Sequence, residues 1–198
     1  MTVSHSHIIN DLSELSGSKV TLRPVTEDMA EDMFEATSES QTELNPFMPW
    51  ENQVVQDAKD FIERSARSRE QGEELQLAIF ERETDEFVGM IGLFQLDPFT
   101  PKGTIGYWIR TSKAGSGFAT DAVSTLLAFC QQRLDLARVD ACVASGNPAS
   151  QRVLEKCGFR REGLKERAEL CHGQWHDVVM YGIVFPYDQK QKDSHSPQ

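Results

Sequence analysis

A short glycine-containing run constrains the fold of this chain more than any other feature, because it joins a strand-like segment to a helix-like segment. The run reads Gly115-Ser116-Gly117-Phe118-Ala119-Thr120. Residues 104–110, before it, are rich in β-branched and aromatic side chains that favour strands. The residues after it place apolar side chains at helical spacing, at Ala119, Ala122, Val123, Leu126, Leu127, Cys130 and Leu134. The glycines therefore lie at a helix N-terminus, where backbone N–H groups and the helix dipole can bind a phosphate.

The two glycines leave two interpretations open: a phosphate cradle, or a tight strand-to-helix turn that needs positive φ angles. Two well-defined nucleotide-binding motifs are disfavoured. The dinucleotide-binding motif would place a third glycine or an alanine where this chain has Thr120, and an acidic residue about twenty positions further on. A P-loop would continue with Gly-Lys-Ser or Gly-Lys-Thr, which does not follow here.

The overall charge narrows the range of partners. The chain has 198 residues, with 20 basic and 31 acidic side chains and a net charge of −11. This balance argues against nucleic-acid binding through phosphate contacts. It suits a cationic small molecule or a peptide amine, although an acidic surface also serves solubility alone. The length fits one domain.

The cysteines and the hydropathy pattern predict a cytoplasmic protein. Cys130, Cys142, Cys157 and Cys171 show no close pairing, so neither a disulfide framework nor a metal site is expected. No segment approaches the run of about 18 apolar residues that spans a membrane. The N-terminus also lacks the basic region and apolar run of a secretion signal.

Periodicity and turn residues divide the chain into strands and helices. Strands are predicted over residues 19–25, 74–82, 86–96, 104–110, 138–144, 159–170 and 175–185. Helices are predicted over residues 26–40, with Thr26 as the cap, over 54–71, after the glycine run, and over 147–157. This order predicts an α/β or α+β sheet with helices on its faces. A single domain is expected over 19–186, between a flexible tail at 1–18 and a polar tail at 187–198.

The last helix has the best-marked ends. Asn147 stands at its N-cap, Pro148 at its first helical position and Gly158 just past its C-terminus, which is the usual placement of these residue types. Ser150 follows at the third helical position, where a hydroxyl often serves helix capping alone.

In this order the chain resembles the GNAT superfamily of acyl-coenzyme A N-acyltransferases, and within it the RimJ/RimL-type N-terminal acetyltransferases. The resemblance spans residues 19–185. Its parts are Leu22-Arg23-Pro24, Gly89-Met90-Ile91-Gly92, Gly106-Tyr107-Trp108-Ile109, the glycine run, Asn147-Pro148-Ala149-Ser150, Leu154-Glu155-Lys156-Cys157-Gly158-Phe159-Arg160, Glu162-Gly163 and His176-Asp177-Val178-Val179-Met180-Tyr181. It implies a mixed, mostly antiparallel, splayed sheet of about seven strands flanked by about four helices.

The resemblance implies acetyl-coenzyme A as the cofactor and places it on three segments. The pyrophosphate would lie on Gly115, Ser116, Gly117, Phe118, Ala119 and Thr120, and the pantetheine arm on Trp108, Ile109, Arg110, Asn147 and Ser150. The backbone N–H near Ile109 would stabilise the thioester oxygen. Ala114 stands where the family prefers Gln or Arg, which predicts weaker cofactor binding rather than a different cofactor.

The resemblance also assigns the chemistry to Glu169 as general base and Ser150 as general acid. Glu166 and His172 are weaker candidates for the base, and Tyr181 is an alternative acid. His176 is expected to pack or hydrogen-bond at the start of a hairpin. The loop aromatics Phe47, Trp50 and Phe99 are candidates for the lining of the acceptor pocket.

The sequence leaves three hypotheses open for the function: acetylation of a protein N-terminus, acetylation of a small amine, or cofactor sensing without catalysis. A protein N-terminus needs little help from a general base. At pH 7 an α-amine with a pKa of ~7.8 is roughly a tenth neutral, whereas a lysine amine is neutral only in about a few parts per ten thousand. A ribosomal-protein N-terminus is its specific form. The alternatives are a small amine, such as a polyamine, antibiotic or amino acid, and a non-catalytic acyl-coenzyme A sensor. Related enzymes often form dimers, so a homodimer is the assembly that the resemblance favours.

Overall fold

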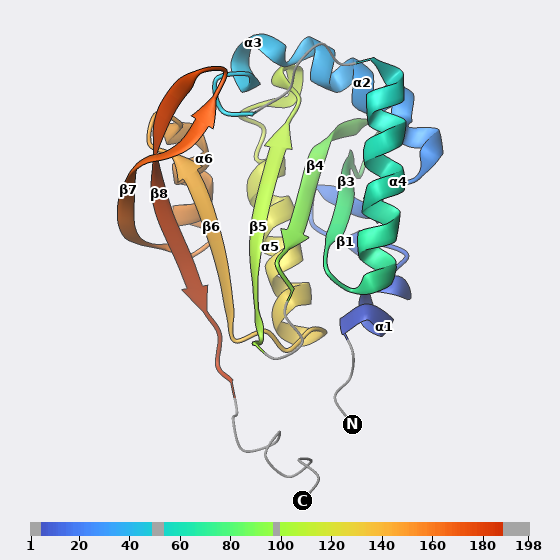
Figure 1. The fold of residues 1–198 in the computed structure, drawn as a ribbon. Coiled ribbons are helices and arrows are strands. Elements are labelled where there is room, and N and C mark those ends of the chain that lie inside the picture. The colour runs from blue at the N-terminus through green and yellow to red at the C-terminus, as the bar shows by residue number, and fades with distance from the viewer. Residues whose placement is uncertain (1–4, 49–53, 97–99, 188–198) are drawn as a thin grey trace, which may run out of the picture.

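The computed structural model describes residues 5–48, 54–96 and 100–187, and these form one eight-stranded sheet with helices on both faces (Figure 1). The strands are β1 (Leu15–Ser16), β2 (Val20–Pro24), β3 (Leu75–Glu81), β4 (Phe87–Phe94), β5 (Lys102–Ile109), β6 (Arg138–Ala144), β7 (Arg160–Cys171) and β8 (Gln174–Val184). The helices are α1 (His5–Asn10), α2 (Ala30–Glu39), α3 (Gln41–Leu44), α4 (Val55–Gln71), α5 (Phe118–Gln132) and α6 (Pro148–Lys156). Short 3-10 turns lie at Glu27–Met29 and Thr111–Lys113.

The strand order is β1-β2-β3-β4-β5-β6-β8-β7. Each neighbouring pair is antiparallel except β5 and β6, which are parallel. The predicted mixed, mostly antiparallel sheet is therefore confirmed, and the part of the chain that the structure describes has one more strand and two more helices than expected. All seven predicted strands are present, and their ends fall within two residues of the predicted ones.

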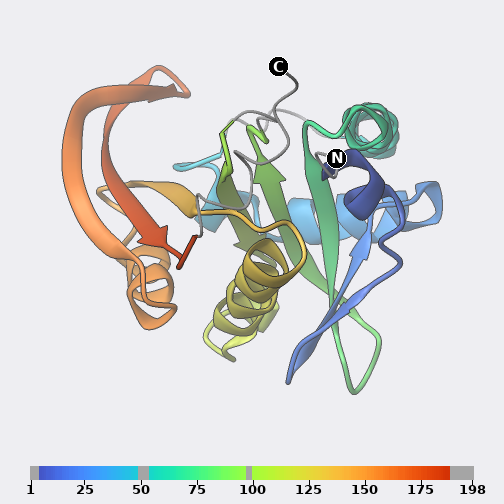
Figure 2. The same cartoon turned by 90° about the horizontal axis from the view of Figure 1, so that it is seen from below.

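Alternation along the central strands divides the core into two layers, because successive strand residues point to opposite faces. On one face, α5 and α6 pack against a set that includes Leu77, Ile79 and Ile91. On the other face, α2 and α4 pack against a set that includes Ala78, Phe80, Met90 and Trp108. Figure 2 shows α5 and α4 on opposite sides of these strands.

The sheet opens between β5 and β6. These two strands pair only from Lys102 opposite Arg138 to Ile105 opposite Ala141. Beyond that point β5 continues against β4 and β6 continues against β8, so the sheet separates into two arms (Figure 1). The predicted splay therefore follows directly from the register.

The N-terminal segment differs from the predicted flexible tail. Its described part folds as α1 and β1, and Ile9 and Leu12 are buried in the core. The guanidinium of Arg69 donates hydrogen bonds to the carbonyl oxygens of Ile9 at 2.8 Å and Asn10 at 2.9 Å. Ile9 and Leu12, together with the partly buried Ile8 and Leu15 and these hydrogen bonds, hold the segment against the core. The predicted tail at 187–198 lies outside the described residues after Tyr187.

The region around α2 differs from prediction in two details. Thr26 makes no side-chain capping hydrogen bond and instead precedes the 3-10 turn that leads into α2. The additional helix α3 follows α2 after the single residue Ser40. The hydroxyl of Ser40 accepts a hydrogen bond at 3.0 Å from the backbone N–H of Thr111, so this junction is fixed by a distant segment.

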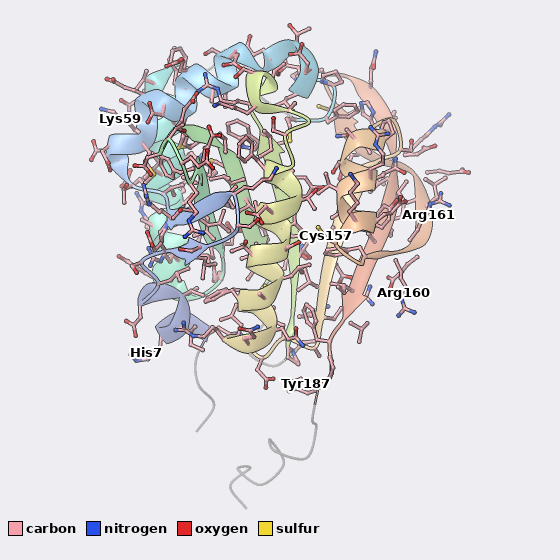
Figure 3. The ribbon with its side chains drawn as sticks, turned by 180° about the vertical axis from the view of Figure 1, so that it is seen from behind. His7, Lys59, Cys157, Arg160, Arg161 and Tyr187 are labelled. Atoms are coloured by element: carbon pink, nitrogen blue, oxygen red, sulfur yellow. The ribbon has the colours of Figure 1, made fainter. Side chains whose placement is uncertain are left out.

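Strands β7 and β8 form a long hairpin that curls away from the rest of the sheet (Figure 2). Only Cys171 is buried in β7. Arg160 and Arg161 project outward at the edge of this hairpin (Figure 3). Among the described residues, no helix combines the length and apolar character that crossing a membrane requires.

Candidate active site

A cavity of about 330 Å³ lies where β5 and β6 separate. Trp108 comes to it from β5, Asn147 and Ser150 from the start of α6, and Glu169 from β7. Of the loop aromatics, Phe47 also lines it, whereas Trp50 and Phe99 lie outside the described residues. The structure thus brings both predicted catalytic residues to one cavity.

The glycine run has the backbone conformation of an anion cradle. Gly115 and Gly117 have φ angles of 79° and 88°, a region that favours glycine. Gly117 is the N-cap of α5, and the first intrahelical hydrogen bond runs from the N–H of Asp121 to the carbonyl of Gly117, at 3.0 Å. The N–H groups of Phe118, Ala119 and Thr120 therefore have no partner within the helix.

Lys19 fixes the orientation of one peptide group in this run. Its ammonium group donates a hydrogen bond at 2.9 Å to the carbonyl oxygen of Ser116. Because the C=O and N–H of a trans peptide point in opposite directions, the N–H of Gly117 points away from Lys19. Lys19 directly precedes β2 and lies 97 positions before Ser116 in the chain, so no sequence pattern indicated this contact.

Asp121 ties the start of β2 to the first turn of α5. Its carboxylate accepts hydrogen bonds from the N–H of Lys19 at 2.7 Å, from the N–H of Val20 at 3.0 Å, and from the hydroxyl of Ser18 at 2.7 Å. Burial alone would raise the pKa of Asp121, but these hydrogen bonds outweigh it and leave the pKa below its ordinary value. The carboxylate is thus charged at neutral pH and holds the cradle to the sheet.

Arg110 does not reach the cavity. Its backbone N–H donates to the carbonyl of Val88 at 2.9 Å, and its guanidinium binds the carboxylate of Glu39 on α2. The hydrogen bond from Arg110 lowers the pKa of Glu39 to about 2, although burial opposes the shift, and the N–H of Ser112 adds to it at 2.8 Å. The guanidinium of Arg110 therefore points to α2 and anchors the segment before the cradle.

The neighbouring residue Ile109 faces the other way. The backbone N–H groups of successive strand residues point to opposite sides of the strand. Because the N–H of Arg110 points to β4, the N–H of Ile109 points the other way, toward the separated β6. The carbonyl of Trp108 lies close against Gly89 of β4, where an added Cβ would come within 2.2 Å of it. This close approach fixes the end of β5 against β4.

The start of α6 positions Ser150 from two sides. The side-chain oxygen of Asn147 accepts the N–H of Ser150 at 3.0 Å, which confirms the predicted capping. The hydroxyl of Ser150 lies 2.9 Å from the hydroxyl of Tyr107, which also donates to the Ser150 carbonyl at 3.1 Å. Burial raises the pKa of Tyr107 strongly, so this phenol keeps its proton. The sequence indicates Tyr107 only as part of a family motif and does not predict its contact with Ser150.

A break in the β7–β8 ladder places Glu169. Between the pairs Lys165–Val178 and Glu169–His176, β7 has three residues and β8 has only Asp177. The carboxylate of Asp177 accepts the N–H of Arg167 at 2.8 Å and closes this bulge. Bulges of this kind commonly redirect side chains near functional sites. Glu169 is exposed and lines the cavity.

The weaker candidates are placed apart from the reacting region. Glu166 lies in the bulge and does not line the cavity. His172 hydrogen-bonds to the carbonyl of Met48 at 3.1 Å, at the tip of the hairpin, and His176 is the cross-strand partner of Glu169. Tyr181 is buried and donates to the carboxylate of Glu155 on α6 at 3.0 Å, so it does not line the cavity.

Comparison with known proteins defines the class of this fold and site. The family model described as "Acetyltransferase (GNAT) domain" matches residues 19–160. The chain belongs to the GNAT acetyltransferase family and is an acyltransferase, as its sequence predicted.

Three relatives illustrate the similarity. The "Uncharacterized N-acetyltransferase YoaA" of Bacillus subtilis is 30% identical over 87% of this chain and 97% of its own length. The "Ribosomal-protein-serine acetyltransferase" of Escherichia coli is 25% identical over 82% of this chain and 91% of its own. The structure of Mycobacterium smegmatis RimJ in complex with CoA-disulfide is 27% identical, covers 87% of this chain and 86% of its own, and superposes with a TM-score of 0.77.

Proposed function

We propose that this acetyltransferase transfers the acetyl group of acetyl-coenzyme A to the α-amine of a protein N-terminus, by direct attack in a ternary complex. The observation that carries the proposal is the meeting of Ser150 and Glu169 in one cavity, although they come from α6 and from the far hairpin. An acid and a base that line one cavity can act on the leaving group and on the amine of the same bound substrates.

The cofactor fits the cradle that the chain provides. Mycobacterium smegmatis RimJ holds coenzyme A in its CoA-disulfide complex, and in this chain the free N–H groups at the start of α5 suit a pyrophosphate. An added Cβ at Gly115 would meet nothing within 4 Å, so the backbone there is open to a ligand. We assign the pyrophosphate to Gly115, Ser116, Gly117, Phe118, Ala119 and Thr120, and the pantetheine arm to Trp108, Ile109, Asn147 and Ser150. Arg110 is left out because its side chain is bound to α2.

Each group of the chain then has one task in the reaction. Acetyl-coenzyme A supplies an acyl carbon bonded to a thiolate leaving group. Glu169 takes a proton from the attacking amine, directly or through water, as the new N–C bond forms. The N–H of Ile109 donates to the carbonyl oxygen as negative charge develops on it. Ser150 gives its hydroxyl proton to the sulfur as the C–S bond breaks, and the proton taken up by Glu169 returns to Ser150 through water, so that amide and free thiol are the net products.

The lining of the cavity favours a single amine over a polycation. Glu169 is the one carboxylate among the described residues that line the cavity, and Met33, Phe47, Met48 and Met90 are among its apolar neighbours. A polyamine or an aminoglycoside would bring several ammonium groups to a surface that offers one negative charge, and unpaired charges are costly to desolvate. The similarity to the Escherichia coli ribosomal-protein-serine acetyltransferase supports a ribosomal protein as the specific acceptor.

The first test measures thiol release from acetyl-coenzyme A with a panel of amines. Peptides that begin with Ser or Ala are expected to be acetylated, whereas the same peptides with a blocked N-terminus are not. Activity on polyamines alone contradicts a peptide acceptor. Tight cofactor binding with slow release for every amine supports a sensor instead.

The second test uses Ser150→Ala and Glu169→Gln. Each is expected to lower kcat by roughly 10²-fold or more. The loss in Glu169→Gln is expected to narrow as the pH rises toward the amine pKa of ~7.8, because the acceptor then arrives neutral. Glu166→Gln is the matched control, since Glu166 lies on the same hairpin outside the cavity lining. Equal activity in Glu169→Gln and Glu166→Gln contradicts the assigned base.

A further inference from the structure

The hydroxyl of Tyr107 links the two arms of the sheet at the acid assigned above. Tyr107 belongs to β5 in one arm, and Ser150 belongs to α6, which follows β6 in the other. The phenol lies within hydrogen-bond distance of two oxygens of this serine, at 2.9 Å from the hydroxyl and 3.1 Å from the carbonyl. Both residues line the cavity.

Counting protons limits this contact to two arrangements. The phenol has one proton, and the Ser150 carbonyl can only accept. In the first arrangement Tyr107 donates to the carbonyl, so the serine proton is held on the phenol oxygen. In the second, Tyr107 donates to the serine hydroxyl, and the serine proton is free to point into the cavity. Two O–H rotations interconvert them, without movement of any heavier atom.

We infer that Tyr107 is a positioning residue that turns the hydroxyl proton of Ser150 toward the leaving group. This inference rests on the proposed function, because it concerns the acid of that reaction. Only in the second arrangement is the Ser150 proton available for the leaving group while the Tyr107 hydroxyl donates a hydrogen bond to the serine oxygen. Asn147 fixes the backbone of Ser150 from the other side, so the hydroxyl is the one part of this residue left to turn.

The phenol acts here as a hydrogen-bond donor and not as the acid. A buried phenolate would be poorly solvated, so Tyr107 keeps its proton throughout the reaction. The proton that reaches the sulfur is that of Ser150, and the proton that Glu169 took from the amine restores it through water. Tyr107 contributes a hydrogen bond that strengthens as the serine oxygen gains negative charge.

Tyr181 provides a matched control. It too is a tyrosine that hydrogen-bonds to α6, but its hydroxyl donates to the carboxylate of Glu155 at 3.0 Å and lies 3.5 Å from the side-chain oxygen of Gln151. Tyr181→Phe therefore removes a phenol that binds the same helix from β8, without removing a hydrogen bond from Ser150.

The experiment compares kcat and KM of the full chain with those of Tyr107→Phe, Ser150→Ala, the double variant and Tyr181→Phe, using a Ser-starting peptide. Tyr107→Phe is expected to lower kcat about 10-fold, the usual scale for one hydrogen bond to a developing charge, and to leave the KM for acetyl-coenzyme A unchanged. In the Ser150→Ala background the same change is expected to have no further effect. Tyr181→Phe is expected to retain the kcat of the unmodified chain.

Three results would overturn the inference. These are an unchanged kcat in Tyr107→Phe, an equal fall in Tyr181→Phe, and a further 10-fold loss in the double variant, which would place Tyr107 outside the action of Ser150. Failure of the proposed function is recognised separately, because the unmodified chain would then acetylate no amine. In that case the same variants are compared by their rates of acetyl-coenzyme A hydrolysis, measured as thiol release in the absence of amine.

A second substitution covers the case in which Tyr107→Phe does not fold. The chain has three tyrosines, so 3-fluorotyrosine introduced into a Tyr181→Phe/Tyr187→Phe background labels position 107 alone. Fluorine makes the phenol a stronger donor, and kcat is expected to rise. An unchanged or lower kcat would contradict the positioning role.

Discussion

The two arms of the sheet hold their functional residues in different ways. In the first arm, six of the seven residues of β3 and seven of the eight of β4 are buried. In the second arm, β7 buries one of its twelve residues. The cofactor cradle is attached to the first arm, and the proposed base, Glu169, belongs to the second. Buried side chains therefore support the strands that carry the cradle, whereas β7, which carries the base, is held mainly by backbone pairing with β8.

The largest expected effect contrasts one glycine from each arm. Gly89 in β4 has a φ angle of 153°, and an added Cβ would come within 2.2 Å of the Trp108 carbonyl. Gly89→Ala is therefore expected to lower the free energy of unfolding by about 3 kcal/mol or more, because β4 and β5 must separate. Gly163 in β7 has nothing within 4 Å of an added Cβ. Gly163→Ala is expected to change the same quantity by less than about 0.5 kcal/mol.

Urea unfolding of the two alanine variants makes this measurement. A similar loss in both would contradict the view that β7 lacks the close packing that holds β4. A larger loss in Gly163→Ala would reverse the comparison.

The next effect contrasts two aspartates that organise backbone groups. Asp121 accepts four hydrogen bonds from Ser18, Lys19 and Val20, whereas Asp177 accepts one from Arg167. Asp121→Asn is expected to cost about 1 to 2 kcal/mol of stability at neutral pH. Asp177→Asn is expected to cost less stability but to lower kcat several-fold, because the bulge that it closes places Glu169. Equal effects on stability and on kcat in the two variants would contradict this division.

The contribution of Asp121 also depends on pH in a defined direction. Its pKa is lower in the folded chain than in the unfolded chain, because hydrogen bonds outweigh the effect of burial. Its carboxylate therefore stabilises the fold at neutral pH, and this contribution is lost as the pH falls through the ordinary aspartate pKa and then through the folded value. The stability difference between the chain and Asp121→Asn is expected to shrink over that range. A constant difference from pH 7 to the acid transition would show that the charge is unimportant.

Sequence reasoning succeeded where the determinants are local. The start of α6 needs only Asn147, Pro148 and their neighbours, and the turn into α5 needs glycines that adopt positive φ. Strand ends followed from alternation and turn residues. These features depend on conformational preferences that each residue carries with it.

The misses share a dependence on distant partners. Ile9 and Leu12 lie in a short segment rich in Ser and His, and Arg69 of α4 hydrogen-bonds to the backbone there. The guanidinium of Arg110 binds Glu39, 71 positions earlier. The contact of Tyr107 with Ser150 spans 43 positions. No local pattern could indicate these pairs, because they form only after the arms of the sheet are in place.

The smallest expected effect tests whether the cradle depends on its distant support. Lys19→Met removes the hydrogen bond to the Ser116 carbonyl, so the peptide that presents the N–H of Gly117 becomes free to turn. The KM for acetyl-coenzyme A is expected to rise about 3- to 5-fold with kcat unchanged, the scale of one exposed hydrogen bond. Lys59→Met, on α4 beside Glu27, is the control for loss of a surface charge. An acetyl-pantetheine donor, which lacks the pyrophosphate, should show no difference between these variants. A KM change with that donor would mean that Lys19 supports the fold of the whole site and not the phosphate-binding backbone.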